Sequence, residues 1–346
     1  MKPVKDRITA ILVSVVAFAF FVGAAWVGPA ASAQTQTQPK PQPQKPTRPE
    51  QHPQDKEDPI TLGTNLVILD VTVVDPSNRP AMDLTQDQFQ VAEDKVQQKI
   101  EFFTREQVPV SMVLAIDTSG SMRAKLDTVI KASTNLVKES RKDDEVAVIE
   151  FKDQPELLEE FTTNIGDVVD TLNGLIASRQ TAMLDALYVG ADYATKEGKN
   201  RRKAVVIVTD GIDKDSYYKF NEVVNHLRET DVQVYLIGFT SDLSKDGAWV
   251  FGRSDKEKAE NLLKQIAEET GGKAFFPREL TEVHTIAQQI SNDLRTQYSI
   301  GYYPTNSKRD GTFRAVKVTI NAGNNRRLVA RTRNGYTAPR EGETRN

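Results

Sequence analysis

Residues 111–122 read Ser-Met-Val-Leu-Ala-Ile-Asp-Thr-Ser-Gly-Ser-Met, and this stretch decides the fold. Its first half, Ser111 to Ile116, is an apolar run typical of a strand that is buried on both faces. Its second half places a carboxylate, Asp117, and two hydroxyls, Ser119 and Ser121, on a turn that leads into a helical pattern. Hard oxygen atoms gathered on one tight turn are the ligands that Mg²⁺ and similar cations prefer. The stretch therefore predicts a strand, a metal-binding turn and a helix in succession.

Two further segments supply oxygen ligands for the same cation. A second apolar run, Ala204 to Thr209, is followed by Asp210 and Gly211. If the two runs are parallel strands, both end at the same edge of a sheet, which brings Asp210 to Asp117. Thr181, which opens another helical pattern, offers one more hydroxyl. We therefore predict a single metal site built from Asp117, Ser119, Ser121, Thr181 and Asp210.

This combination resembles the metal-ion-dependent adhesion site of von Willebrand factor type A (VWA) domains, a family that includes integrin inserted domains and many bacterial envelope proteins. The resemblance covers roughly residues 108–296, and its signature is Asp-x-Ser-x-Ser, then Thr, then Thr-Asp-Gly in that order. It implies a bound divalent cation, Mg²⁺ or else Mn²⁺ or Ca²⁺, whose coordination is completed by an Asp or Glu of a protein partner. Arg179 and Gln180 stand where related domains often have glycines. The flanking segments 83–89 and 301–304 are similar to a subgroup of the family that is abundant in Acidobacteria.

Strand and helix patterns alternate within residues 108–296, which is typical of a parallel sheet covered by helices on both faces. The fold class is therefore α/β, with a doubly wound, mostly parallel, Rossmann-like sheet. We predict strands at 111–116, 145–151, 203–209, 232–239 and 273–276, with an antiparallel edge strand at 157–162. Helices are predicted near 123–140, 182–195, 217–229, 257–270 and 280–295.

The segments on either side of this domain, 60–107 and 297–338, read as short strands separated by turns. Neither segment alone has enough strands for a stable domain. We therefore predict that both flanks pair into one small β-sandwich into which the α/β domain is inserted. Several bases gather late in the chain, and we interpret them as residues that protect an exposed sheet edge from pairing with other strands. They are Arg314, Lys317, Arg326, Arg327, Arg331 and Arg333.

The amino-terminal residues 1–33 are typical of an export signal. Three bases precede an apolar stretch, Ile8 to Val27, and a small-residue cleavage site, Ala31-Ser32-Ala33. The apolar stretch is also long enough to remain as an uncleaved membrane anchor. Residues 34–59 are rich in Gln and Pro and predict a disordered tether, and 339–346 predict a disordered tail. We therefore expect a periplasmic or extracellular protein that touches the membrane only through the signal segment, if that segment is kept.

Charge and residue usage argue against several function classes. The whole chain carries a formal charge of −3 and residues 1–33 carry a net charge of +2, which leaves −5 for the rest and argues against nucleic acid as a partner. No Gly-x-Ser-x-Gly elbow or phosphate-binding Gly-rich loop is present. His52 lies in the tether, and His226 and His284 lie within helical patterns.

We therefore favour a metal-dependent protein-binding module, for adhesion or envelope assembly, over an enzyme. Two alternatives stay open at this point. One is an envelope structural protein whose metal only steadies the fold. The other, less favoured, is a metal-dependent hydrolase that uses carboxylates for acid and base chemistry.

Two further hypotheses concern the edge of the sheet and the last helix. The loop at 241–256 follows a strand and so emerges at the metal edge, where Trp249 and Phe251 either plug the end of the sheet or anchor a partner. The last predicted helix runs into the strand at 297–303 without a linker. It either transmits partner binding to the β-sandwich or fixes a rigid junction.

Overall fold

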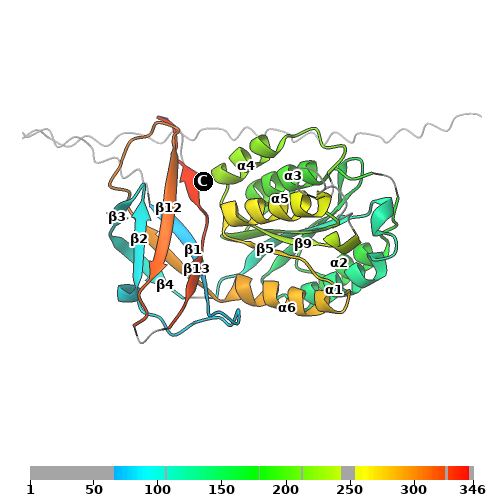
Figure 1. Cartoon of the computed structure of the whole chain (residues 1–346), viewed down its shortest axis with the longest axis horizontal. Helices are drawn as coiled ribbons and strands as arrows, with labels where there is room; N and C mark the ends of the chain where they lie inside the picture. The colour runs from blue at the N-terminus through cyan, green and yellow to red at the C-terminus, as the bar shows by residue number, and fades with distance from the viewer. Residues whose placement is uncertain are drawn as a thin grey trace, which may run out of the picture. The chain divides into compact units, whose positions relative to one another are not determined.

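The structure is a computed structural model that describes residues 66–342, except 106, 179, 212, 243–253, 324–325 and the side chain of Asp242. These residues all belong to one compact unit, Thr61–Asn346, which contains three β-sheets (Figure 1). The predicted signal segment and tether lie outside the described residues. The first residues of the predicted tail are part of the described structure, and one of them, Arg340, forms an isolated β-bridge with Asp310. In the described part of the chain, no helix combines the length and the apolar character that a bilayer crossing requires.

The central sheet has six strands in the order β10-β9-β8-β5-β6-β7. All neighbouring strands are parallel except β6 and β7, so the predicted antiparallel edge strand is confirmed. Every residue of β5, β6 and β9 is buried, as the continuous apolar runs predicted. The strands are β5 (Val110–Asp117), β6 (Glu145–Phe151), β7 (Pro155–Thr162), β8 (Arg202–Thr209), β9 (Val232–Gly238) and β10 (Lys273–Phe275).

Helices cover both faces of this sheet, which confirms the predicted doubly wound α/β class (Figure 1). One face packs against α1 (Leu126–Lys138), α2 (Ile165–Asn173) and α6 (Glu282–Arg295). The other face packs against α3 (Met183–Glu197), α4 (Phe220–Glu229) and α5 (Asp255–Thr270).

Three local details differ from the predicted helices. The nine-residue helix α2 was not predicted, because a short segment with only two fully buried positions gives little periodic signal. Helix α1 begins at Leu126 because the 3₁₀ turn η2 (Gly120–Met122) precedes it. Helix α4 begins at Phe220 because the backbone before it is hydrogen-bonded elsewhere, as described below.

The order of the strands creates a switch point between β5 and β8. From β5 the chain moves to β6 on one side, and it later continues from β8 to β9 on the other side. In open α/β sheets the crevice for ligands lies at such a point, outside the carboxyl ends of the strands. The turns after Asp117 and after Thr209 are therefore next to each other at this edge.

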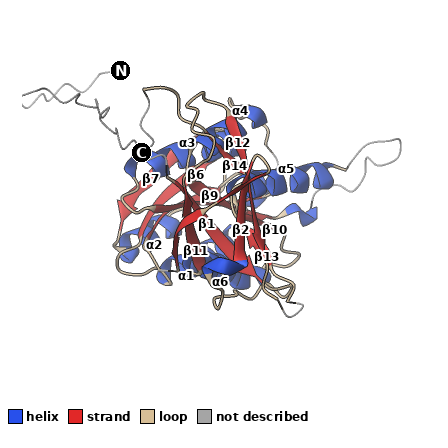
Figure 2. Cartoon of the chain, turned by 90° about the vertical axis from the view of Figure 1, so that its left-hand side faces the viewer, coloured by secondary structure: helices blue, strands red, loops and turns tan. Residues whose placement is uncertain are grey.

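The two flanks of the chain pair with each other in two four-stranded sheets, β13-β1-β11-β4 and β14-β12-β2-β3 (Figure 2). Strand β1 pairs with β11, and β12 pairs with β2, so each sheet combines strands from both ends of the chain. A shared apolar core lies between the sheets, which makes them the predicted β-sandwich. The strands are β1 (Val67–Val74), β2 (Phe89–Glu93), β3 (Val96–Gln98), β4 (Ile100–Thr104), β11 (Gln297–Tyr302), β12 (Phe313–Ile320), β13 (Val329–Arg331) and β14 (Gly335–Thr337), with a 3₁₀ turn η1 (Gln86–Gln88) before β2.

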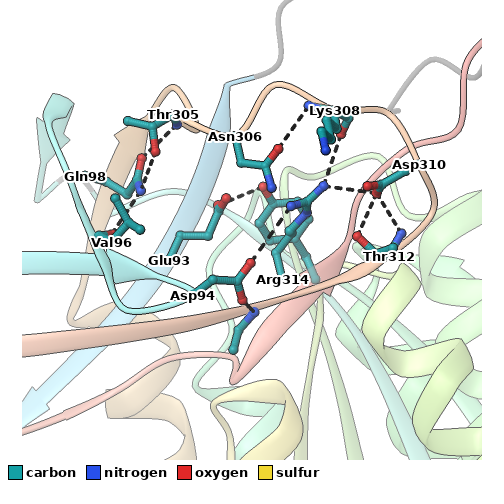
Figure 3. A network of polar contacts seen from close by, with 12 residues as sticks. Glu93, Asp94, Val96, Gln98, Thr305, Asn306, Lys308, Asp310, Thr312 and Arg314 are labelled. Carbon is teal, nitrogen blue, oxygen red and sulfur yellow. Dashed lines mark hydrogen bonds and ion pairs between the residues drawn. The ribbon is translucent and has the colours of Figure 1, made fainter.

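The interpretation of the late bases as edge guards is wrong for Arg314, Arg331 and Arg333. The Arg314 side chain is buried, and its guanidinium donates to the Lys308 carbonyl at 3.3 Å and to Asp310 Oδ1 at 3.0 Å (Figure 3). Arg331 donates to Asp293 of α6 at 2.6 Å, and Arg333 pairs with Asp231. These bases hold loops and helices of the same unit, which a strand pattern alone does not reveal.

Candidate functional site

Asp117 ends β5 with a fully buried side chain. Its Oδ1 accepts a hydrogen bond from the Ser119 N–H at 2.9 Å, and its Oδ2 accepts one from the Thr209 hydroxyl at 2.8 Å. Thr209 is the last residue of β8. The carboxylate is thus fixed between its own turn and the end of the neighbouring strand.

Ser119 and Ser121 lie on the turn between β5 and α1, and their hydroxyl oxygens are 3.1 Å apart. Ser119 is buried and Ser121 is exposed, so the pair reaches from the sheet edge toward solvent. Met122 fixes the turn, because its N–H donates to the Ser119 carbonyl at 3.0 Å and its side chain is fully buried. The turn therefore brings the hydroxyls of Ser119 and Ser121 together just after Asp117.

Backbone hydrogen bonds join the loop of Thr181 to the other two loops of the site. The Ser178 N–H donates to the Thr118 carbonyl at 2.6 Å, which ties this loop to the first turn. The Thr181 carbonyl accepts from the N–H groups of Lys214 and Asp215, at 3.0 and 3.2 Å, in the loop after β8. Thr181 itself is buried. The hydrogen bonds described for Thr181 at this edge are accepted by its backbone carbonyl.

Asp210 follows β8 directly and is also buried. Gly211 comes next with φ of +83°, a left-handed conformation that favours glycine. A Cβ at this position would lie 3.3 Å from both Ala259 and Leu263, so the turn also packs closely against α5. The predicted carboxylates thus end two adjacent parallel strands.

The electrostatics of this edge suit a cation. Burial raises the pKa of Asp117 to about 6, and the negative charge of Asp210 adds to this effect, while hydrogen bonds from Ser119 and Thr209 oppose it. Burial therefore makes the charged form of Asp117 less favourable than it is in water, and a divalent cation would offset this effect. Two carboxylates with three hydroxyls are a donor set of hard oxygens, which fits Mg²⁺. In the described part of the chain, no group of three or more Asp, Glu or His side chains could hold a metal ion, and the candidate site combines two carboxylates with hydroxyls instead.

Glu150 accepts a hydrogen bond from the first turn and so helps to fix it, and the sequence analysis did not predict this role. It lies on β6 and is buried. Its Oε1 accepts from the Thr118 hydroxyl at 2.8 Å, and its Oε2 accepts from the Lys152 ammonium at 2.9 Å. The signal that could have revealed it is a lone acid near the carboxyl end of an otherwise apolar run.

Two more aspartates fix the loop after β8, and only the fold reveals their contacts. Asp213 Oδ1 accepts from the N–H groups of Met183 and Leu184, at 2.9 and 3.2 Å, and so caps α3 from another segment. Asp185 accepts from the N–H groups of Tyr217 and Tyr218, at 3.0 and 2.9 Å. Asp185 therefore holds this loop, in addition to the favourable charge that it places in the first turn of α3.

Three aromatic rings stack beside this loop, and one of them is the imidazole of a histidine. Tyr188 of α3 lies parallel to Tyr218 with centroids 3.8 Å apart and to His226 of α4 at 4.0 Å. Burial lowers the pKa of His226, against the opposing charges of Asp192 and Glu229, while the charge of Lys196 lowers it further.

His226→Phe is expected to make the protein less sensitive to acid. The unfolded state binds a proton at the ordinary histidine pKa, whereas the folded state binds it only at lower pH. The stability that depends on neutral His226 is therefore complete above the unfolded pKa of about 6.5 and is lost as pH falls through the folded pKa. Urea unfolding at pH 7.5 and 5.5 checks this: the loss between the two values should be larger in the wild type than in the variant, and equal losses would refute it.

Trp249 and Phe251, predicted as partner-binding residues, lie outside the described residues. The strand that leads to their loop is in place, because β9 ends at Gly238 and Phe239 N–H donates to the Thr209 carbonyl at 2.8 Å. The loop therefore starts next to the end of β8, at the edge that carries Asp117 and Asp210.

Comparison with known proteins identifies the family. Residues 111–289 match the von Willebrand factor type A domain, which is more than half of the chain's 346 residues. The chain therefore belongs to the VWA domain family, and the match contains all five predicted site residues. No curated protein sequence matches the chain significantly.

Solved structures with a similar fold come from several bacteria. A von Willebrand factor type A protein from Catenulispora acidiphila is 16% identical over 66% of this chain and 50% of that chain, with a TM-score of 0.45. An aerotolerance-related membrane protein from Bacteroides fragilis is 18% identical over 54% of this chain and 98% of that chain, at 0.42. The vWF domain of the type V pili tip protein Mfa5 from Porphyromonas gingivalis is 14% identical over 54% and 97%, at 0.43. The family assignment rests on the sequence match and not on these similarities.

Proposed function

We propose that this VWA domain is a metal-dependent protein-binding module of the cell envelope or the extracellular space. Asp117, Ser119, Ser121, Thr181 and Asp210 hold one divalent cation, and an Asp or Glu of a partner protein completes its coordination. The observation that supports the proposal is the position of two buried aspartates at the ends of the adjacent parallel strands β5 and β8. The serine hydroxyls of the first turn lie at the same switch point of the sheet.

The cation is expected to be Mg²⁺, with Mn²⁺ and Ca²⁺ as alternatives. Mg²⁺ uses few protein carboxylates and keeps other positions for water or a ligand, which agrees with a site of two aspartates and three hydroxyls. When bound, the cation supplies the positive charge that attracts the partner's carboxylate. The side chains of the five site residues would hold the cation through hard oxygen ligands.

The proposal includes export by residues 1–33 and no enzymatic activity. Trp249 and Phe251 remain proposed partner contacts, because the loop that carries them follows β9 at the metal edge. Trp249→Ala should then weaken partner binding without changing the melting temperature. A loss of folding in this variant would instead favour a plug over the end of the sheet.

A pulldown from an envelope extract tests the proposed function. The protein should retain partners in Mg²⁺ and release them with chelator, and Asp117→Ala should retain none in either condition. Melting measured in the same two conditions separates the structural alternative. If chelator lowers the melting temperature but leaves the captured proteins unchanged, the metal only steadies the fold and the proposal fails.

Glu150→Ala is expected to weaken Mg²⁺ binding about tenfold, because groups that orient metal-binding segments typically contribute 10- to 100-fold in affinity. The change removes the acceptor of the Thr118 hydroxyl, which stands between Asp117 and Ser119. Titration calorimetry provides the measurement. Glu156→Ala is a matched control, since Glu156 lies opposite Glu150 on β7 but is exposed. Equal affinities in the two variants would exclude a positioning role for Glu150.

A further inference from the structure

Two apolar side chains project into solvent from the loops of the candidate site. Tyr217 is 81% exposed and Ile176 is 75% exposed, and every other large hydrophobic residue in the described part of the chain is at most 54% exposed. Single exposed hydrophobic residues are common on protein surfaces. These two differ because each lies on a loop that is hydrogen-bonded to another loop or helix of the candidate site.

Ile176 lies in the loop between α2 and α3. The preceding Leu175 is buried in the core. Two residues after Ile176, the Ser178 N–H donates to the Thr118 carbonyl at 2.6 Å, between Asp117 and Ser119. The backbone on both sides of Ile176 is therefore fixed, while its side chain faces water.

The backbone around Tyr217, on the loop after β8, is fixed by hydrogen bonds in a similar way. The N–H of Tyr217 and that of Tyr218 both donate to the buried Asp185 carboxylate. The Tyr218 ring stacks on Tyr188 with an interplanar angle of 7°. Two residues before Tyr217, the Asp215 N–H donates to the Thr181 carbonyl. An exposed aromatic ring on such a fixed backbone loses little conformational entropy when it binds a partner.

The exposed charges on the loops of the candidate site, including the first turn, indicate what kind of partner would fit. Outside the candidate ligands, the described exposed charges are basic at Arg123, Lys214 and Lys219 and acidic at Asp215. A bound divalent cation would add to the positive charge. An acidic segment therefore complements this edge electrostatically, and a basic one is repelled.

We propose that Ile176 and Tyr217 form an apolar rim that selects the partner's sequence. The rim binds apolar or aromatic side chains on either side of the Asp or Glu that reaches the cation. This inference rests on the proposed function for the acidic residue, while the apolar preference rests on the two exposed side chains. Large apolar anchors next to a desolvated polar contact are the usual pattern of binding hot spots.

A displayed peptide library with one fixed central Asp provides the probe. Selection against the full-length protein in Mg²⁺ should enrich apolar or aromatic residues next to the Asp. The best peptide is then synthesised and its affinity is measured for the wild type, Ile176→Ser and Tyr217→Ser. We expect each change to weaken binding about tenfold, because hot-spot residues typically contribute at least this much. Tyr303→Ser is the matched control, since Tyr303 is 54% exposed in the β-sandwich, and it should bind as the wild type does.

The outcomes separate the rim from the cation site. Both rim variants should bind Mg²⁺ with wild-type affinity in calorimetry, because neither side chain is a ligand. Peptide binding that needs Mg²⁺ but is unchanged in both rim variants, or enrichment without any apolar preference, overturns the rim alone. Peptide binding that persists in chelator and in Asp117→Ala, yet is lost in the rim variants, overturns the proposed function alone. Failure to enrich any peptide contradicts both.

Discussion

Asp117→Asn is expected to abolish the stabilisation of the protein by Mg²⁺. A ligand that binds only the folded state adds RT ln(1 + [L]/Kd) to the free energy of unfolding, which is about 2.7 kcal/mol at a hundred times Kd. Removing the carboxylate removes both a proposed ligand and a negative charge from the site, so the variant should gain almost nothing. Denaturant unfolding of both proteins, in Mg²⁺ and in chelator, gives the four free energies required.

In chelator the same variant should be at least as stable as the wild type. The amide can keep the hydrogen bonds from Ser119 or Thr209 on its oxygen, and it removes a buried negative charge beside Asp210. Asp127→Asn, on the exposed side of α1, is the control and should gain as much from Mg²⁺ as the wild type does. An equal Mg²⁺ gain in the Asp117→Asn variant would place the cation elsewhere.

Asp70→Ala is expected to lower the free energy of unfolding by about 3 kcal/mol, because breaking a buried ion pair leaves an uncompensated charge. Asp70 lies on β1 and contacts Arg202 at 3.4 Å and Arg201 at 3.2 Å. Arg202 is 1% exposed, and burial lowers the pKa of its guanidinium. The same guanidinium donates to the Leu294 carbonyl at the end of α6 at 2.8 Å. The Asp70 variant therefore leaves a nearly inaccessible cation without its carboxylate.

An exposed pair of the same chemistry gives the matched control. Asp83 and Arg326 are in contact at 2.7 Å, but their side chains are 65% and 41% exposed. Asp83→Ala should cost at most about 1 kcal/mol, since surface ion pairs contribute little. Similar losses in the two variants would show that burial of Arg202 does not determine the energy of the contact.

The contacts of Arg202 also bear on the last helix. Leu294 and Asp293 of α6 are bound by Arg202 and Arg331, from β8 and from β13 of the sandwich. These contacts support the hypothesis of a rigid junction over one in which α6 shifts when a partner binds. Hydrogen exchange confined to the loops of the site upon partner binding would agree with a rigid junction.

Much of this architecture was predictable because it depends on local patterns. The apolar runs Ser111 to Ile116 and Ala204 to Thr209 are long, and an aspartate follows each of them directly. A parallel sheet then brings the two ends together without any knowledge of side-chain contacts. Short elements such as β3 and β14, with three residues each, carry too little periodicity to be predicted.

The supporting contacts of the site were not predictable for a different reason. Asp213 caps a helix about 30 residues earlier in the chain, and Glu150 reaches the first turn from the next strand. Such pairs depend on which loops meet in space, which composition and spacing do not encode. The bases of the last strands were misinterpreted for the same reason, because Arg331 meets α6 only in the folded protein.

The proposed function requires one divalent cation to bind between the ends of β5 and β8. A crystal of the protein soaked with Mn²⁺ tests this directly, because anomalous scattering locates the ion. We expect one strong peak within ligand distance of Asp117 and the hydroxyls of Ser119 and Ser121, and its loss in crystals of Asp117→Ala. A peak elsewhere, or none at saturating Mn²⁺, would contradict the account.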